Sequence, residues 1–134
     1  MAQRVTLAGA VIVSTPQDIA LLDARRGVRM FERTKVPLLG LIENMSFFCC
    51  PNCNHRSEIF GHGGARMEAE RLGCEFLGEV PLVVEIRTAA DAGTPVVASA
   101  PDSPPAQAFA AIARRLWDKV NGETVRSGPR IVIS

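Results

Sequence analysis

The sequence predicts an α/β fold with a doubly wound, mainly parallel sheet. Short apolar segments, typical of strands buried on both faces, alternate along the chain with segments of helical periodicity. The chain has 134 residues, of which 47% are hydrophobic and 22% charged. These values are those of one ordinary globular domain that is long enough to bury a core.

The first half of the sequence predicts a β-α-β unit. The apolar run over residues 9–14 predicts a strand. Thr15 as N-cap and Pro16 at the first helical position predict a helix that ends near Glu32. A second buried strand is expected over residues 37–43, joined to the first by a right-handed crossover. The buried side of the helix is expected to contain Ile19, Leu22, Met30 and Phe31.

The second half is expected to begin with an irregular stretch over about residues 44–64, and loops of that length usually have a function. The elements expected after it are a helix over 65–72 that Gly73 ends, a strand over 75–80, a helix over 83–92, a short extended piece over 96–98 and an amphipathic helix from 104 to about 120. The residues expected on the core face of the last helix are Phe109, Ile112, Ala113, Leu116, Trp117 and Val120. We assign residues 1–121 to the domain and expect 122–134 to form a flexible tail, in which 130–133 could pair as an edge strand.

Composition argues against several classes of protein. The formal charge is +1, from 15 basic and 14 acidic residues scattered along the chain, which argues against a nucleic-acid partner and a polybasic membrane anchor. No apolar run approaches the ~20 residues that span a bilayer, so stable membrane insertion is not expected. The N-terminus lacks the layout of a signal peptide, and the cysteines are therefore expected to be reduced, in a cytosolic or matrix-like compartment.

The lysines exclude a phosphate-binding P-loop within this chain. Such a loop needs a lysine directly before Ser or Thr at the end of a glycine-rich turn. Only Lys35 and Lys119 are present, and each is followed by valine. We therefore do not expect this chain to hydrolyse ATP on its own.

Cys50-Pro51-Asn52-Cys53 is the strongest local chemical signal. Two thiolates at this spacing can bind one soft metal, but they cannot complete a tetrahedral thiolate site. His55 or His62 could complete a zinc site, or a second copy of the chain could supply two more thiolates for a [4Fe-4S] cluster. A redox dithiol is less favoured, because such motifs normally open a helix. The pair could also be two ordinary loop cysteines.

Other features of the chain have simpler expectations. Cys49 and Cys74 are expected to be structural, with Cys74 packed in the core. The strand ends at residues 15–17, 43–45 and 80–82 should meet at one edge of the sheet, where ligands of such folds bind.

Six ordered motifs resemble one known family. They are Gly-Ala-Val-Ile-Val-Ser-Thr-Pro-Gln-Asp (9–18), Gly-Leu-Ile-Glu-Asn-Met-Ser (40–46), Cys-Pro-Asn-Cys-Asn-His (50–55), Ile-Phe-Gly-His-Gly-Gly-Ala (59–65), Leu-Gly-Glu-Val-Pro-Leu (77–82) and Asp-Ala-Gly-Thr-Pro-Val-Val (91–97). Over about residues 9–120 the chain resembles the C-terminal half of the Mrp/ApbC-type P-loop ATPases, iron–sulfur cluster carriers of the MinD-like class. Among these, it is most similar to the mitochondrial members that serve respiratory complex I and to their bacterial counterparts.

The resemblance implies a function and a set of site residues. Cys50 and Cys53 match the pair that holds a [4Fe-4S] cluster bridged across a homodimer. Asn44 matches the residue that recognises the adenine of the nucleotide, and Pro81 matches the loop that packs on the adenine face. The implied partners are recipient iron–sulfur apoproteins, possibly complex I subunits, in the mitochondrial matrix or in a bacterial cytoplasm.

Departures from the family pattern limit what the resemblance implies. The family's P-loop and its Asp-containing magnesium segments lie upstream, so ATP and Mg²⁺ are implied only for a complete chain, and we expect this sequence to be a fragment. Asn54 replaces a common glycine, and Val83 stands where relatives usually have an acidic residue. Two alternatives stay open, which are a zinc-stabilised binding module and an inactive ATPase fragment with no carrier role.

Overall fold

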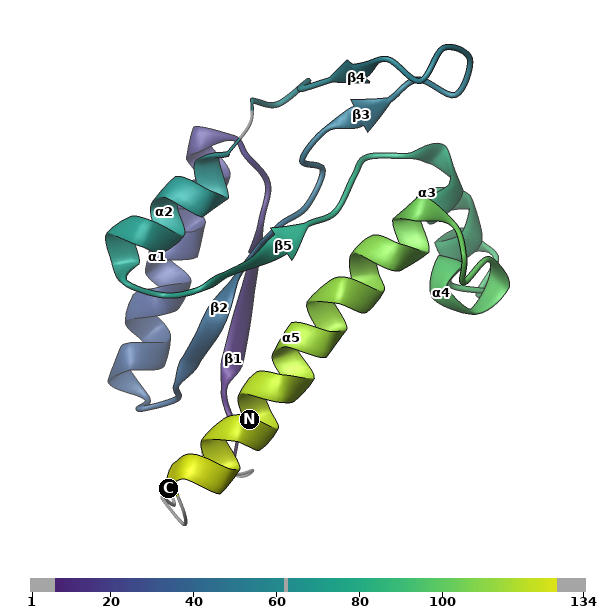
Figure 1. The fold of residues 1–134 in the computed structure, drawn as a ribbon. Helices are drawn as coiled ribbons and strands as arrows, with labels where there is room; N and C mark the ends of the chain where they lie inside the picture. Colours follow the sequence, from purple (N-terminus) through teal and green to yellow (C-terminus); the bar gives the residue numbers. More distant parts are fainter. Residues whose placement is uncertain (1–6, 62, 128–134) are drawn as a thin grey trace.

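The computed structural model describes residues 7–61 and 63–127 (Figure 1). Its elements, in chain order, are β1 (Ala10–Ser14), α1 (Asp18–Arg33), β2 (Leu38–Glu43), β3 (Phe48–Cys49), β4 (Arg56–Ser57), α2 (Gly64–Leu72), β5 (Phe76–Glu79), α3 (Val84–Asp91), α4 (Val96–Ser99) and α5 (Pro104–Ser127). The predicted alternation of strands and helices is confirmed. The stretch over 44–64 contains a short hairpin, β3–β4, that the sequence did not define.

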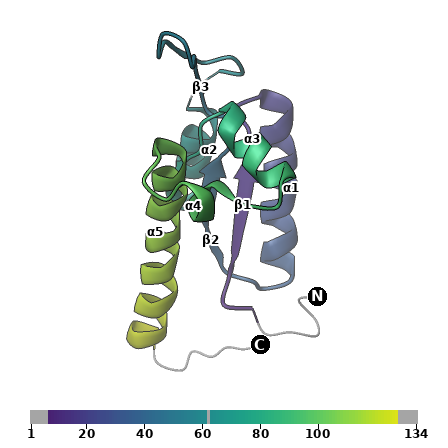
Figure 2. The ribbon, with the colours of Figure 1, turned by 90° about the vertical axis from the view of Figure 1, so that its right-hand side faces the viewer.

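The main sheet has three parallel strands in the order β1-β2-β5. Helices α1 and α2 cover one face of the sheet and α5 covers the other, which gives three layers (Figure 1). Because all three strands are parallel, their carboxyl ends lie at one edge of the sheet. The hairpin β3–β4 extends from that same end of the molecule, away from the body of α5 (Figure 2).

Each face of the sheet has its own apolar core. On the face of α1 and α2, Leu41 is fully buried, and it packs in a cluster with Ile12, Ala24, Val28 and Ala69. On the face of α5, Leu77 packs with Val80 and Ile112. Cys74 packs against the first cluster, so its predicted structural role is confirmed.

The predicted start of α1 is wrong. Gln17 is the N-cap and the helix begins at Asp18, with no side-chain hydrogen bond at the cap. The Thr15 hydroxyl instead contacts Gln17 Oε1 at 3.2 Å. Thr15 and Pro16 belong to the loop that follows β1.

The buried face of α1 also differs from the prediction. The buried residues of α1 recur at helical spacing on one face, and they are Leu21, Ala24 and Val28. Only Phe31 of the predicted set packs against the core. The large apolar residues that the prediction placed inside are instead exposed, namely Ile19, Leu22 and Met30.

The C-terminal third holds two further corrections. Residues 96–98 are not extended but lie in the short helix α4, which begins directly after Pro95. The last helix continues to Ser127, beyond its predicted end near Val120. Within it, Ile112 is buried as predicted, whereas Ala113 is exposed and Trp117 is 71% exposed. The remainder of the expected tail, including 130–133, lies outside the described residues.

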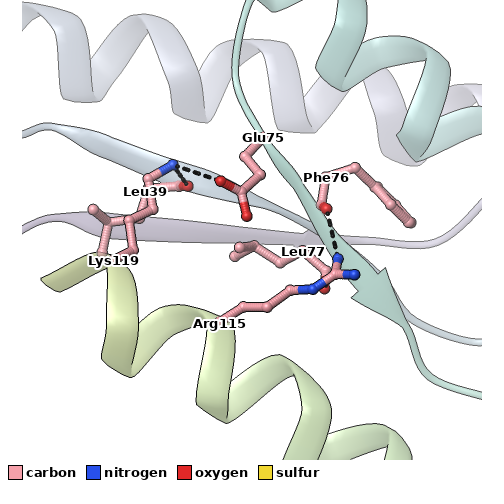
Figure 3. A network of polar contacts seen from close by, with 6 residues as sticks. All are labelled: Leu39, Glu75, Phe76, Leu77, Arg115 and Lys119. Atoms are coloured by element: carbon pink, nitrogen blue, oxygen red, sulfur yellow. Dashed lines mark hydrogen bonds and ion pairs between the residues drawn. The ribbon is translucent and has the colours of Figure 1, made fainter. Parts of the chain in front are cut away.

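Two basic side chains fasten α5 to the sheet (Figure 3). Arg115 donates from Nη1 to the carbonyl oxygens of Leu77 (3.0 Å) and Phe76 (3.3 Å). Lys119 Nζ donates to the carbonyl oxygen of Leu39 (2.6 Å) and lies 3.4 Å from Glu75 Oε1. Because β5 is an edge strand of the three-stranded sheet, its outer carbonyls need partners from outside the sheet, and Arg115 supplies one.

Replacing Arg25 with alanine is expected to lower the free energy of unfolding by about 2 kcal/mol at pH 7. Arg25 makes two 2.7 Å hydrogen bonds to Glu68, whose side chain is only 4% exposed. The variant leaves this nearly buried carboxylate with the more distant Arg71, at 3.6 Å, as its ion-pair partner. Urea denaturation measures the change. The matched control is Arg26→Ala, which removes an exposed 3.5 Å ion pair with Asp23 and should change stability by less than about 0.5 kcal/mol.

The effect of Arg25→Ala should depend on pH. The hydrogen bond from Arg25 holds the pKa of Glu68 below its ordinary value of 4.5. The folded protein therefore binds this proton less readily than the unfolded chain does, and the pair stabilises the fold fully above the unfolded pKa. As the pH falls below 4.5 and through the folded pKa, this stabilisation is lost. A difference between wild type and variant that is as large at pH 3 as at pH 7 would contradict the assignment.

Within the described ranges, no helix combines the length and the apolar character needed to cross a bilayer.

Candidate metal and nucleotide sites

The cysteine pair lies at the tip of the hairpin β3–β4. The two strands pair antiparallel, with Phe48 opposite Ser57 and Cys49 opposite Arg56. Cys50 begins the tip, where its N–H donates to the carbonyl oxygen of His55 at 2.9 Å. This hydrogen bond closes the backbone of the tip, and residues 51–56 are exposed.

Asn54 has a conformation that explains why it can stand in for glycine. Its φ is 60°, in the left-handed region that glycine and asparagine adopt most readily. The Asn54 N–H donates to the carbonyl oxygen of Cys50 at 2.8 Å. The chain therefore turns sharply after Cys53 and returns to β4.

The two cysteines are available to a metal from outside the molecule. Cys53 is exposed and Cys50 is half-buried, and neither forms a disulfide. The pKa of the Cys50 thiol is lowered, first by the backbone N–H of Asn52 and then by the backbone N–H and the thiol of Cys53. The thiolate is the form that binds metals, so these donors favour metal binding at Cys50.

The histidines do not complete a site in the part of the chain that is described. No group of three or more His, Cys, Asp or Glu side chains there is arranged to hold a metal ion. His55 is exposed, and His62 lies outside the described residues. Cys49 lies half-buried in β3. Among the described residues, no third His, Cys, Asp or Glu side chain joins the cysteine pair in a metal site, and completion by His62 stays untested.

Asn44 and Pro81 follow neighbouring strands, as predicted. The register pairs Glu43 with Glu79, and Asn44 and Pro81 follow these at the carboxyl edge of the sheet. The Asn44 N–H donates to the carbonyl oxygen of Ser14 at 2.7 Å, which ties its loop to the end of β1. Its side-chain oxygen accepts the Met45 N–H at 2.9 Å, so the side-chain amide stays able to donate to a ligand.

A buried polar network that the sequence analysis missed lies at the same edge. Glu43 and Ser46 are both fully buried. The Ser46 hydroxyl lies within hydrogen-bond distance of two carboxylates, at 2.9 Å from Glu43 Oε2 and 2.7 Å from Glu79 Oε2. The signal available in the sequence was an acidic residue at the end of an otherwise apolar strand, where a buried charge requires hydrogen-bonding partners.

A cavity of about 240 Å³ lies at the opposite end of the sheet from Asn44 and Pro81. Its walls include Val28, Leu38 and Cys74, near the start of β2 and of β5. Burial raises the pKa of the Cys74 thiol, which keeps this thiol protonated at neutral pH. Cys74 lies just before the start of β5, at the opposite end of the strand from the segment that contacts the hairpin.

The fold matches part of the fold of the MinD-like P-loop ATPases. The septum-site-determining protein MinD of Pyrococcus horikoshii OT3, solved with Mg-ADP, superposes with a TM-score of 0.67 at 24% identity, over 86% of this chain and 43% of that one. A nucleotide-binding protein of Archaeoglobus fulgidus, solved with ADP, superposes with a TM-score of 0.57 at 41% identity. That match covers 64% of this chain and 35% of that one.

The chain belongs to the ParA-class family described as the NUBPL iron-transfer P-loop NTPases, whose profile matches residues 1–117. It is similar to an iron–sulfur cluster transfer protein NUBPL of Dictyostelium discoideum, with 52% identity over 87% of this chain and 36% of that protein. An Arabidopsis thaliana iron–sulfur protein required for NADH dehydrogenase, mitochondrial, is 51% identical over 87% of this chain and 37% of that protein. An iron–sulfur cluster carrier protein of Salmonella typhimurium is 47% identical over 96% of this chain and 34% of that protein. The chain thus spans about a third of the length of these relatives.

Proposed function

We propose that this chain is the cluster-holding part of an iron–sulfur cluster transfer protein. The observation that supports this most strongly is the pair Cys50 and Cys53, which lie at the tip of a projecting hairpin and form no disulfide. Such a position lets the sulfurs reach iron that another molecule also binds. The relatives, which are named as cluster transfer and carrier proteins, support the same function.

The cluster is proposed to be of the [4Fe-4S] type and to be shared by two copies of the chain. A [4Fe-4S] cluster takes four cysteine thiolates, and each chain offers two at this hairpin. A two-fold axis through the cluster would bring the same hairpin from each copy, which is the geometry of a closed homodimer. The tip leaves room for the second hairpin, since residues 51–56 are exposed.

The cluster is cargo rather than a permanent cofactor in this proposal. A cluster held by exposed loop ligands and shared between two chains can be given up when an acceptor offers better ligands. Its recipients are iron–sulfur apoproteins, and the Arabidopsis relative's name makes complex I subunits the leading candidates. The corresponding location is the mitochondrial matrix, or the cytoplasm for a bacterial protein.

Asn44 and Pro81 are proposed to contact a nucleotide base in the complete protein. Their place at the carboxyl edge of a parallel sheet is where ligands of such folds bind. The Asn44 amide can donate to a base edge, and the loop of Pro81 can pack on its face. ATP and Mg²⁺ would need the P-loop of a longer chain, because the lysines of this one are not placed in such a loop.

Anaerobic reconstitution with iron and sulfide tests the proposal. The expected product is a brown dimer with four irons and four sulfides per two chains on size-exclusion chromatography. A monomer that retains a full cluster would contradict sharing between copies. A colourless chain that binds one zinc and takes up no iron or sulfide would contradict the carrier function and favour the zinc-stabilised alternative.

A further inference from the structure

We propose that Arg56 is a positioning residue for the cysteine pair, which holds the hairpin against the carboxyl end of β5 and thereby slows release of the cluster. This inference rests on the proposed function for its consequence, but its structural part concerns the hairpin alone. Arg56 lies on β4, just after the tip that contains both cysteines.

Arg56 makes two contacts across the base of the hairpin. Its guanidinium carbon lies 3.8 Å from the centroid of the Phe47 ring, a stacking distance for a cation over an aromatic face. Its Nη2 lies 4.0 Å from Glu79 Oε1, at the end of β5. One side chain thus joins the returning strand of the hairpin to the segment that enters it and to the main sheet.

The partner of Arg56 is itself fixed. Glu79 accepts a 2.7 Å hydrogen bond from Ser46, which also contacts the buried Glu43. The position of the Arg56 guanidinium is therefore set by a network rooted in the ends of β2 and β5. A guanidinium suits this role, because it stacks on a ring through its flat face and meets a carboxylate through its edge.

The backbone connects the same parts. The Leu82 N–H donates to the carbonyl oxygen of Phe47 at 2.7 Å, and Phe48 forms a parallel bridge with Leu82. The hairpin therefore rests on the segment that contains Pro81. If Arg56 is lost, these backbone contacts remain, but the side-chain support of the hairpin is removed, and both the tip and Leu82 should become more mobile.

The first test measures amide hydrogen exchange in the full 134-residue chain without cluster. Arg56→Ala should raise exchange at the N–H groups of Cys50 and Leu82 about fivefold, the factor expected from losing one exposed cation–π contact and one weak ion pair. Exchange at the Leu41 N–H, which donates to Glu75 in the sheet, should not change. Arg56→Lys, which retains a cation but not the flat fork, should give an intermediate value.

The second test measures transfer of the reconstituted cluster to an apo-ferredoxin that accepts [4Fe-4S]. Arg56→Ala should load as much iron and sulfide as wild type but transfer it several times faster. Glu79→Gln, which keeps an oxygen for Ser46 and leaves the stack of Arg56 on Phe47, should give a smaller increase, and the double variant should be no faster than Arg56→Ala alone. The matched control is Arg87→Ala, which removes a 3.9 Å ion pair with Asp91 on α3 and should alter neither measurement.

The two proposals fail in different ways. If wild type takes up no iron or sulfide, the carrier function is overturned, and the exchange experiment still decides whether Arg56 holds the hairpin. If wild type loads a cluster but Arg56→Ala changes neither exchange at Cys50 nor the transfer rate, the positioning role is overturned and the carrier function stands. Equal increases in exchange at the N–H groups of Cys50 and Leu41 would mean general destabilisation and would also overturn the positioning role of Arg56.

Discussion

Replacing Cys50 or Cys53 with alanine is expected to abolish cluster loading while the fold stays close to native. Each substitution leaves one cysteine of the pair in each chain, so the two pairs together could offer a [4Fe-4S] cluster only two of its four ligands. The fold should survive because both residues lie at the hairpin tip, outside both core clusters. Iron and sulfide analysis after anaerobic reconstitution measures the loss, and circular dichroism with thermal denaturation verifies the fold.

The remaining cysteines provide matched controls for this experiment. Cys74→Ala should reduce stability by about 1 kcal/mol, because the thiol packs against the core, and it should load as much cluster as wild type. Cys49→Ala tests the neighbouring thiol in β3 and should also load normally. Loss of iron in Cys74→Ala alone, or full loading in Cys53→Ala, would show that the ligands are assigned to the wrong residues.

The fold could be predicted because its strands have an unambiguous pattern. Residues 9–14 and 37–43 are apolar and rich in β-branched or large aliphatic side chains, and a helix signal separates them, so a β-α-β unit was the natural interpretation. The end of α2 was also predictable, since Gly73 adopts the left-handed conformation, with φ 72°, that typically stops a helix.

Packing between helices and the sheet was harder to predict. The choice of Ile19, Leu22 and Met30 for the inner face of α1 followed their apolar character, whereas the residues that the helix buries are Leu21, Ala24 and Val28. Trp117 was placed inside for the same reason, although it is 71% exposed. Helical periodicity defines a stripe of residues, but which stripe faces the sheet depends on the crossing geometry of the two elements.

The candidate site was predictable only in its local part. Cys50 and Cys53 stand out because their spacing is visible in the sequence. The contacts of Arg56 with Phe47 and Glu79 are not visible there, since they join residues from a hairpin, a loop and the end of β5. Long-range polar contacts of this kind depend on tertiary placement, which no spacing rule supplies.

Replacing Gly40 with alanine is expected to lower the free energy of unfolding by about 3 kcal/mol, the upper end of the usual cost of overpacking a core. Gly40 lies in the central strand β2, where an added Cβ would lie 2.6 Å from the carbonyl oxygen of Glu75 and 2.7 Å from Leu77 Cγ. That carbonyl accepts the Leu41 N–H, so relief of the clash must separate β2 from β5. Urea denaturation measures the loss of stability.

The same substitution at Gly122 provides the control, because nothing lies within 4 Å of the Cβ that it would add. In α5 alanine is the better helix former, so Gly122→Ala should raise stability by about 0.5–1 kcal/mol.

The separation of β2 from β5 in Gly40→Ala should also displace Glu79, the ion-pair partner of Arg56, and so loosen the cysteine hairpin. If Gly40→Ala is as stable as wild type, the close spacing of β2 and β5 at Gly40 is contradicted. The position of Glu79 as the support of Arg56 would then be contradicted as well.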